Sequence, residues 1–184
     1  MLPNQIETEH LTLRPFGRDD ASAVFEYWQS DPNWPKFNAS VPANFTEKDA
    51  TNFTLEMSAR NQEDRPNWAI IFSGKVSGVV SLSFEQNYQI CVLGYGIHGQ
   101  LRGRGFSTEA ARAVIDAAFS SCDRLQRIRA HTDADNEASM RVLQKIGFMK
   151  EGTLRKNQFV KGQFRDEAIF GLLRSEWGET QDDA

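Results

Sequence analysis

The 184-residue sequence contains little cysteine and histidine and no long apolar run. Its two cysteines and three histidines show no metal-ligand spacing, so we expect reduced thiols and no metal site. No apolar segment approaches the ~18 residues of a membrane-spanning helix, and the first residues lack the basic start of a secretion signal. We therefore expect a cytoplasmic protein that does not associate with a membrane.

The sequence also lacks an excess of positive charge. Its formal net charge is −4 at pH 7, which argues against nucleic acid as a partner, because nucleic-acid binding requires a basic face. A mildly acidic protein is compatible with an amine substrate. Internal repeats, low-complexity segments and long linkers are also missing, so we expect a single domain over residues 1–184.

Glycine, by contrast, is concentrated in one place. Five of the 13 glycines fall in the first twelve residues of the segment 94–111. An apolar, strand-like segment precedes them, and an alanine-rich helix follows. Glycines let backbone N–H groups turn inward, and a helix N-terminus adds unpaired donors and the positive end of a dipole. The order of strand, glycine loop and helix therefore predicts a pyrophosphate site, to which Arg102 and Arg104 add positive charge.

Three phosphate-binding motifs compete for this segment. Residues 94–99 match the dinucleotide pattern Gly-x-Gly-x-x-Gly, but no helix is expected to start at Gly99. A nucleotide-binding module that uses these residues would bind NAD. The Gly-Lys-Ser/Thr of a P-loop is absent. Residues 100–105 match a third pattern, Gln-x-x-Gly-x-Gly, which opens directly into the helix and is the best fit.

Residues 100–105 resemble the acyl-CoA-binding signature of the GNAT superfamily of N-acetyltransferases. Residues 136–148 read Asn-x-x-Ser-x-x-Val-Leu-x-Lys-x-Gly-Phe, which is similar to the RimJ/RimL-type branch that acetylates ribosomal-protein N-termini. The resemblance extends from about Ala69 to Trp177. It implies an α/β (α+β) fold, with a mixed, mostly antiparallel twisted sheet flanked by helices. It also implies transfer of acetyl from acetyl-CoA, as a cosubstrate, to a primary amine by direct attack in a ternary complex.

The resemblance also implies the roles of individual residues. The pantetheine arm would lie along the strand before the loop, and Ser139 would lie near the cofactor sulfur and donate a proton to the thiolate. The implied cofactor-binding residues are Tyr95, Gly96, Ile97, Arg102, Gly103, Arg104, Gly105, Phe106, Ser107, Asn136, Arg141 and Lys145. Alternatives stay open: Asn136 as a helix cap only, Ser139 as a packing residue, and Arg141 with Lys145 as a solvated helix face.

Two departures from the family pattern concern proton transfer. Many members use a tyrosine as the acid, and Leu143 occupies that position. Some ribosomal-protein acetyltransferases have a glutamate where this sequence has Gln158. These departures motivate a rival hypothesis, a non-catalytic acyl-CoA-binding or sensing domain, which turnover of acetyl-CoA with amines would exclude. Side chains that could act as the base, none supported by a motif, are Glu85, His98, His131, Asp133 and Asp135.

The acceptor side is less well defined by the sequence. Trp34, in a proline-containing segment, and Glu85 are our candidate substrate contacts. An α-amino group has a pKa near 8, so roughly a tenth of it is neutral at pH 7, whereas a lysine amine near 10.4 needs more help. This chemistry favours a protein N-terminus, and a small-molecule amine stays open. Either a monomer or a homodimer is compatible with the sequence.

Periodicity and turn signals predict the elements of the chain. A hairpin is expected at residues 73–75, and residues 31–44 are expected to be irregular. The helix that starts at Thr46 or Glu47 should direct Phe53, Met57 and Leu55 inward. The other expected strands are 6–16, 68–72, 76–84, 88–98, 127–132, 148–155, 158–160 and 167–173, and the other expected helices are 18–30, 110–119 and 136–147.

Overall fold

A computed structural model describes residues 2–31, 34–37, 41–60 and 63–179, without the side chains of Trp34 and Glu179. The strands are β1 (Ile6–Glu7), β2 (Thr12–Arg14), β3 (Asn67–Phe72), β4 (Lys75–Glu85), β5 (Ile90–Ile97), β6 (Arg127–Asp133), β7 (Met149–Val160) and β8 (Gln163–Leu173). The α-helices are α1 (Ala21–Gln29), α2 (Trp34–Phe37), α3 (Glu47–Ala59), α4 (Phe106–Ser121), α5 (Glu137–Ile146) and α6 (Arg174–Glu179), and 3₁₀ turns cover Arg18–Asp20 and Gly99–Leu101.

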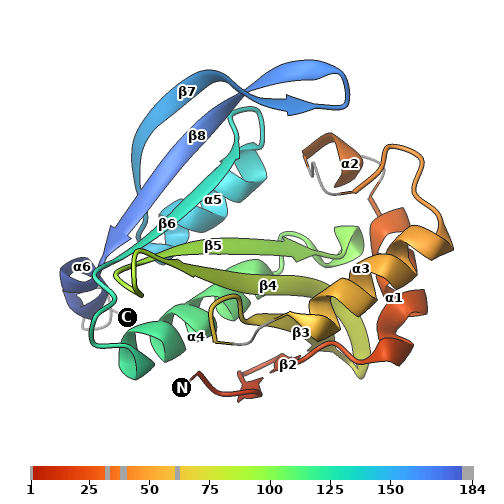
Figure 1. Cartoon of the computed structure of the whole chain (residues 1–184), viewed down its shortest axis with the longest axis horizontal. Coiled ribbons are helices and arrows are strands. Elements are labelled where there is room, and N and C mark those ends of the chain that lie inside the picture. Colours follow the sequence, from red (N-terminus) through yellow and green to blue (C-terminus); the bar gives the residue numbers. More distant parts are fainter. Residues whose placement is uncertain (1, 32–33, 38–40, 61–62, 180–184) are drawn as a thin grey trace.

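The described strands form one sheet in the order β1-β2-β3-β4-β5-β6-β8-β7. Every neighbouring pair is antiparallel except β5 and β6, which run parallel. Figure 1 shows the β7–β8 hairpin rising away from β3, β4 and β5, with its tip opposite α2. The mixed, mostly antiparallel sheet with flanking helices is the fold class that the sequence predicts.

The sheet opens between its two parallel strands. β5 and β6 pair only through residues 90–92 and 127–129, although both strands continue for several residues beyond this point. β6 instead continues its pairing on the other side, with β8, as far as Asp133. The ends of β5 and β6 therefore separate, and the backbone of β5 from Leu93 onward faces a space rather than another strand.

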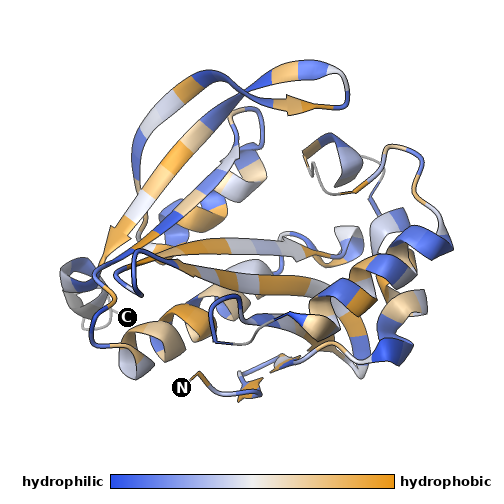
Figure 2. Cartoon of the chain, in the orientation of Figure 1, coloured by the Kyte–Doolittle hydropathy of each residue, from blue (hydrophilic) through white to orange (hydrophobic). Residues whose placement is uncertain are grey.

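Helices cover both faces of the first half of the sheet. Alternation along β3 sends Trp68 and Ile70 to one side and Ala69 to the other, as expected for a strand buried on both faces. The first side packs against α4, and the second packs against α1 and α3. In Figure 2, hydrophobic residues, drawn in orange, lie along the inner strands and on the inward faces of these helices.

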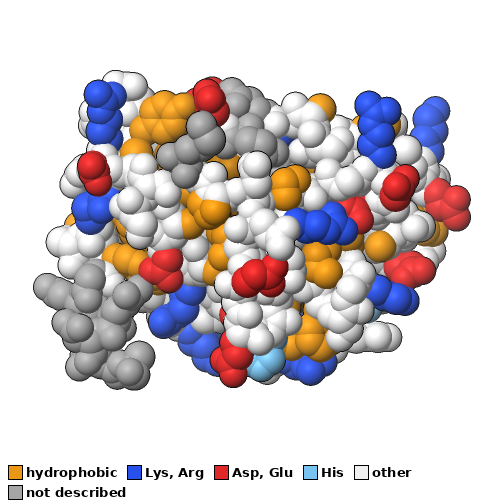
Figure 3. Space-filling model, turned by 90° about the horizontal axis from the view of Figure 1, so that it is seen from below, with side chains coloured by type: hydrophobic (Ala, Val, Ile, Leu, Met, Phe, Trp, Pro, Cys, Tyr) orange, Lys and Arg blue, Asp and Glu red, His pale blue; other side chains and the backbone are white. Residues whose placement is uncertain are grey.

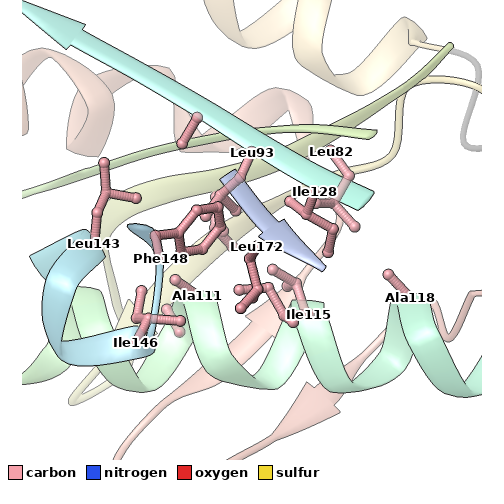
Figure 4. Close-up of a cluster of buried hydrophobic side chains, with 14 of the residues drawn as sticks. Leu82, Leu93, Ala111, Ile115, Ala118, Ile128, Leu143, Ile146, Phe148 and Leu172 are labelled. Atoms are coloured by element: carbon pink, nitrogen blue, oxygen red, sulfur yellow. The ribbon is translucent and has the colours of Figure 1, made fainter. Parts of the chain in front are cut away.

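The largest cluster of buried side chains joins the two halves of the sheet. Figure 4 shows Ala111 and Ile115 of α4 directed toward Ile128 of β6 and Leu172 of β8. Helix α5 adds apolar side chains from the same side, so α4 and α5 lie on one face of the sheet, next to its opening. The loops that begin these two helices consequently lie close to each other.

Several predicted elements are confirmed, and others are wrong for local reasons. Ser73 and Gly74 have φ of 50° and 77°, as the expected tight hairpin requires. Residues 6–16 form a short hairpin, β1–β2, instead of one strand, and Thr8 N–H donates to the Leu11 carbonyl at 2.9 Å. Leu55 is 40% exposed, since it lies about 100° around α3 from the buried Thr54.

Two further segments differ from the prediction. The segment predicted to be irregular contains α2, and its Pro35 is tolerated because it lies in the first helical turn, where no intrahelical N–H bond is lost. The predicted C-terminal strand pieces are two long strands. β7 runs through an irregularity between Leu154 and Gln158, where Lys156 has φ of 52°.

Gly78 holds β4 close to β5, and this contact supplies a test of the sheet register. A Cβ at Gly78 would lie 2.3 Å from the Gly96 carbonyl oxygen, which is backbone and has no rotamer to change. We expect Gly78→Ala to destabilise the fold by about 1–3 kcal/mol and to lower the unfolding midpoint by roughly 2–12 °C. Thermal unfolding checks this. Gly152→Ala is the matched control, because nothing lies within 4 Å of its Cβ, and equal midpoints for the two variants would contradict the packing argument.

The surface that carries α4 mixes charges of both signs. Seen from below, basic, acidic and apolar side chains alternate, and neither sign dominates this face (Figure 3). Within the described ranges, no helix combines the length and the apolar character that crossing a membrane requires.

Candidate functional site

The loop before α4 depends on two glycines with left-handed backbone. Gly103 has φ of 77°, and Gly105, the N-cap of α4, has φ of 88°. No atom lies within 4 Å of a Cβ added at either position, so the backbone conformation, not lack of space, requires glycine here. The N–H of Glu109 donates to the Gly105 carbonyl at 2.9 Å. The N–H groups of the three residues before it belong to the unpaired first turn of a 16-residue helix.

A cavity of about 510 Å³ lies between this loop and α5, and we call it the α4–α5 cavity. It contains all the cofactor-binding and catalytic residues expected from the sequence except Arg104. Its lining is Tyr95, Gly96, Ile97, Leu101, Arg102, Gly103, Gly105, Phe106, Ser107, Thr108, Asn136, Ala138, Ser139, Arg141, Val142 and Lys145. These residues come from β5, from the loop and first turn of α4, and from the start of α5.

The start of α5 is held by a side-chain cap. Asn136 Oδ1 accepts a hydrogen bond from the Ser139 N–H at 3.2 Å, and Gly147, with φ of 113°, ends the helix. Asn136 therefore caps the helix and also lines the cavity. Arg141 forms an ion pair with Glu137 at 3.0 Å on the exposed side, while it and Lys145 reach the cavity rim.

The two arginines of the glycine loop have different surroundings. Arg102 Nη2 lies 2.5 Å from Asp31 Oδ2 and lines the cavity. Arg104 does not line it, and its guanidinium stacks on the rings of Phe72 and Phe106 at 5.0 and 4.8 Å. Stacking of this kind orients the guanidinium over the aromatic faces. Of the two arginines, only Arg102 thus lies beside the space next to the α4 N-terminus.

The exposed edge of β5 supplies backbone groups to the same space. His98 N–H donates to the Ser77 carbonyl at 2.7 Å, which continues the ladder between β4 and β5. Because antiparallel hydrogen bonding alternates along a strand, Leu93, Tyr95 and Ile97 direct their N–H and C=O groups to the opposite edge. That edge is the one that β6 leaves after residue 92.

A second cavity of about 440 Å³ fills the opening between β5 and β6, and we call it the β5–β6 cavity. Its walls come from both halves of the sheet, from α2 and α3, and from β7. The lining is Phe37, Phe53, Met57, Arg60, Val79, Ser81, Ser83, Val92, Leu93, Gly94, Tyr95, Arg102, Ala130, His131, Thr132, Asp133, Asn136, Ser139, Leu143 and Gln158. The two cavities share four residues, Tyr95, Arg102, Asn136 and Ser139, so they meet at the start of α5.

Two hydroxyl groups touch where the cavities meet. Tyr95 Oη lies 2.9 Å from Ser139 Oγ and 3.0 Å from the Ser139 carbonyl oxygen. Burial raises the pKa of Tyr95 to about 12, although the hydrogen bond with Ser139 acts to lower it. Leu143, at the position where many family members have a tyrosine, is buried and contributes an apolar wall to the β5–β6 cavity.

Two of the five candidate bases, Asp133 and His131, line the β5–β6 cavity. Burial acts to raise the pKa of Asp133, but hydrogen bonds from the Arg165 guanidinium at 2.6 and 3.0 Å outweigh it, so the pKa lies below its ordinary value. A carboxylate held in this way is a weak proton acceptor. His131 is half exposed, and its Nε2 lies 3.8 Å from the buried carboxylate of Glu167.

Two neutral side chains also bind the Glu167 carboxylate. Asn157 Nδ2 donates to it at 2.6 Å, and Gln158 Nε2 also donates to it. Gln158, at the position where some ribosomal-protein acetyltransferases have a glutamate, therefore binds the carboxylate of Glu167 through its side-chain amide. Glu167 was not among the residues singled out in the sequence, because β6 and β8 come together only in the folded sheet.

The other predicted residues lie away from both cavities or outside the described side chains. Glu85 forms an ion pair with Arg129 at 2.7 Å near the closed end of β5 and β6. His98 stacks on Tyr27, and Asp135 is exposed beside Arg165. Trp34 begins α2, but its side chain lies outside the part of the chain that the structure describes.

Four residues of the α4–α5 cavity were missed by sequence reasoning: Leu101, Thr108, Ala138 and Val142. Ala138 and Val142 share a helix face with Ser139 and Lys145, so helical periodicity could have found them. Among the described residues, no group of three or more histidine, cysteine, aspartate or glutamate side chains is arranged to hold a metal ion.

Comparison with known proteins identifies the family of the chain. Residues 10–149 match the family model described as "Acetyltransferase (GNAT) domain". The chain is 31% identical over 175 residues to the uncharacterised N-acetyltransferase p20 of Bacillus licheniformis, covering 92% of this chain and 96% of that protein. It is 30% identical over 105 residues to the [ribosomal protein uS5]-alanine N-acetyltransferase of Escherichia coli, covering 56% and 54% of the two chains.

Solved structures share the fold. A GNAT-family acetyltransferase from Bacillus anthracis is 28% identical and superimposes with a TM-score of 0.81, covering 94% of this chain and 99% of that one. The region matched by the family model contains the glycine loop, the capped start of α5 and the ends of β5 and β6 that separate. This chain belongs to the GNAT family of acetyltransferases, enzymes that use acetyl-CoA as the acetyl donor.

Proposed function

We propose that this protein transfers the acetyl group of acetyl-CoA to the α-amino group at the N-terminus of a protein. The observation that carries the proposal is the meeting of two cavities at Ser139. One cavity begins at the N-terminus of α4, which suits a diphosphate, and the other opens between β5 and β6. A thioester at the junction would be within reach of an amine from the second cavity.

The α4–α5 cavity suits the cofactor in three respects. The unpaired N–H groups of the first turn of α4, with Gly103 and Arg102, would bind the diphosphate. The open edge of β5 at Tyr95 and Ile97 would pair with the amides of the pantetheine arm as an added strand does. Lys145, at the rim of the cavity, would interact with the 3′-phosphate.

The β5–β6 cavity favours an α-amine over a polyamine or an aminoglycoside. Among the described residues that line it, the one carboxylate is Asp133, and Arg165 already neutralises it. The lining also carries Arg60 and Arg102. A polycation would lose hydration there without gaining a free anionic partner.

The reaction requires one proton acceptor, and His131 is our candidate. The amine nitrogen attacks the thioester carbon, the N–C bond forms and the C–S bond breaks with both electrons passing to sulfur. The surplus proton on nitrogen moves to His131, whose imidazolium form the buried Glu167 carboxylate would stabilise. An amide N–H of β5 near Ile97 would polarise the carbonyl, and Ser139 Oγ–H would donate to the sulfur. Asp133 and Arg129 lie on the same strand as His131, Arg165 of β8 is paired with Asp133, and Arg60 and Arg102 line the same cavity.

Thermal unfolding in the presence of acetyl-CoA tests the cofactor assignment. A ligand at 100 times its Kd stabilises by about 2.7 kcal/mol, which raises the midpoint of a domain of this size by roughly 5–11 °C. We expect this rise with acetyl-CoA and no rise with NAD or ATP. A rise with NAD and none with acetyl-CoA would overturn the placement of the cofactor.

Acetyl transfer to defined amines tests the acceptor class. We expect turnover with short peptides that have a free N-terminal alanine or serine, and none with the same peptides blocked at the N-terminus but carrying a lysine. Spermidine and an aminoglycoside serve as small-molecule comparisons. Turnover of these amines with no turnover of the peptides would replace the N-terminal acceptor by a small molecule.

A further inference from the structure

The hydroxyl contact between Tyr95 and Ser139 has a consequence for the cofactor sulfur. Tyr95 comes from β5 on the sheet side, and Ser139 comes from the first turn of α5. They are separated by 44 positions in the chain, yet their oxygens lie 2.9 Å apart at the junction of the two cavities. Among the described residues, the other two that line both cavities are Arg102 and Asn136, so Tyr95 and Ser139 carry the two hydroxyl groups at the junction.

The two hydroxyls have two protons and three oxygen acceptors to share. Tyr95 Oη–H can donate either to the Ser139 carbonyl, at 3.0 Å, or to Ser139 Oγ, at 2.9 Å. In the first arrangement, Ser139 Oγ–H donates to Tyr95 Oη and points away from the cofactor. In the second, Tyr95 donates to Oγ, and the Ser139 proton is free to point toward a third acceptor. Burial keeps the phenol protonated, because it raises the pKa of Tyr95 to about 12.

We propose that Tyr95 is a positioning residue whose hydroxyl donates to Ser139 Oγ and thereby directs the Ser139 proton to the sulfur of the cofactor. The inference rests on the proposed function, which puts the thioester at the junction of the cavities. As the C–S bond breaks, its electron pair passes to sulfur, and the thiolate accepts a hydrogen bond from Ser139 Oγ. The hydrogen bond that Tyr95 donates to Ser139 Oγ strengthens the hydrogen bond from Ser139 to the thiolate, because successive hydrogen bonds polarise one another.

The test measures the thiol of bound CoA, so it needs no acceptor. The ultraviolet absorbance of the thiolate is followed against pH for the CoA complex, with the desulfo-CoA complex subtracted to remove the protein signal. In the wild-type protein we expect the bound thiol to ionise at lower pH than free CoA. Tyr95→Phe is expected to move this titration back toward free CoA by about one pH unit, and Ser139→Ala by at least as much.

The double variant shows whether the two residues act as a unit. We expect Tyr95→Phe combined with Ser139→Ala to ionise the thiol at the same pH as Ser139→Ala alone, because Tyr95 acts through Ser139. Where a peptide acceptor is turned over, kcat of Tyr95→Phe should fall roughly ten- to hundredfold with KM for acetyl-CoA unchanged. Additive effects of the two changes, or an unchanged titration in Tyr95→Phe, would overturn the inference.

Controls separate this inference from the proposed function. Tyr88→Phe removes another phenol hydroxyl, which donates to Asp64 Oδ1 at 2.5 Å. Tyr88 lines neither cavity, so this change should leave the thiol titration as in the wild type. Tyr95→Phe should keep the rise in midpoint with acetyl-CoA, which shows that fold and cofactor binding persist. If CoA does not bind the wild-type protein, the proposed function and this inference both fail. If CoA binds and Tyr95→Phe titrates as the wild type does, this inference alone fails.

Discussion

Gly103→Asp is expected to weaken acetyl-CoA binding roughly ten- to hundredfold while the protein stays folded. The added side chain would enter open space, because nothing lies within 4 Å of its Cβ. The carboxylate would then lie beside the proposed diphosphate site at the N-terminus of α4. Two unit charges about 4–8 Å apart repel by about 2–4 kcal/mol in a medium of effective dielectric near 20, and solvent screening reduces this. Isothermal titration calorimetry with acetyl-CoA measures the loss.

The matched control for this change is Gly103→Asn. Both side chains have the same shape, and both are among the residues that best tolerate the positive φ of 77° at this position. Any backbone strain is therefore common to the two variants, and only the charge differs. Equal affinities of the two variants for acetyl-CoA would refute the placement of the diphosphate at this loop.

His131→Gln is expected to lower kcat/KM by roughly 10²- to 10³-fold with a peptide acceptor, which is within the range for loss of a general base. Its midpoint should still rise with acetyl-CoA, because His131 lines only the β5–β6 cavity.

His98→Asn is the matched control for the histidine. His98 lines neither cavity, and its Nδ1 accepts from the Gln100 N–H at 3.3 Å, a role that an asparagine oxygen can take. Burial lowers the pKa of His98 from its ordinary value, and Glu26 partly opposes this shift. Its replacement should leave kcat/KM with the peptide acceptor close to that of the wild type. A large loss of kcat/KM in His98→Asn, and not in His131→Gln, would exclude His131 as the base.

The cofactor side of the site was largely predictable from sequence because it is local. Strand, glycine loop and helix follow one another within residues 90–111, and their geometry depends on backbone conformation that glycine signals directly. The capped helix from Asn136 to Gly147 is local in the same way. Arg104 is the exception, since its partner Phe72 lies on a distant strand.

The acceptor side depended on contacts that no local pattern contains. Alternation along β6 identifies which side chains share a face, but it does not say which strand lies beside it. The pairing of β6 with β8 brings Glu167 to His131, and the separation of β6 from β5 opens the cavity that His131 lines. Glu85, also a candidate in the sequence, lies at the closed end of the same two strands.

The sequence by itself determined the family, the fold class and the glycine loop at the start of α4. These follow from the order of elements and from residues whose conformational preferences act over a few positions. Only the tertiary structure decided that Tyr95 meets Ser139 and that Gln158 and His131 share the Glu167 carboxylate. Such contacts join residues far apart in the chain, and they are set by strand order, register and the angle at which the sheet opens.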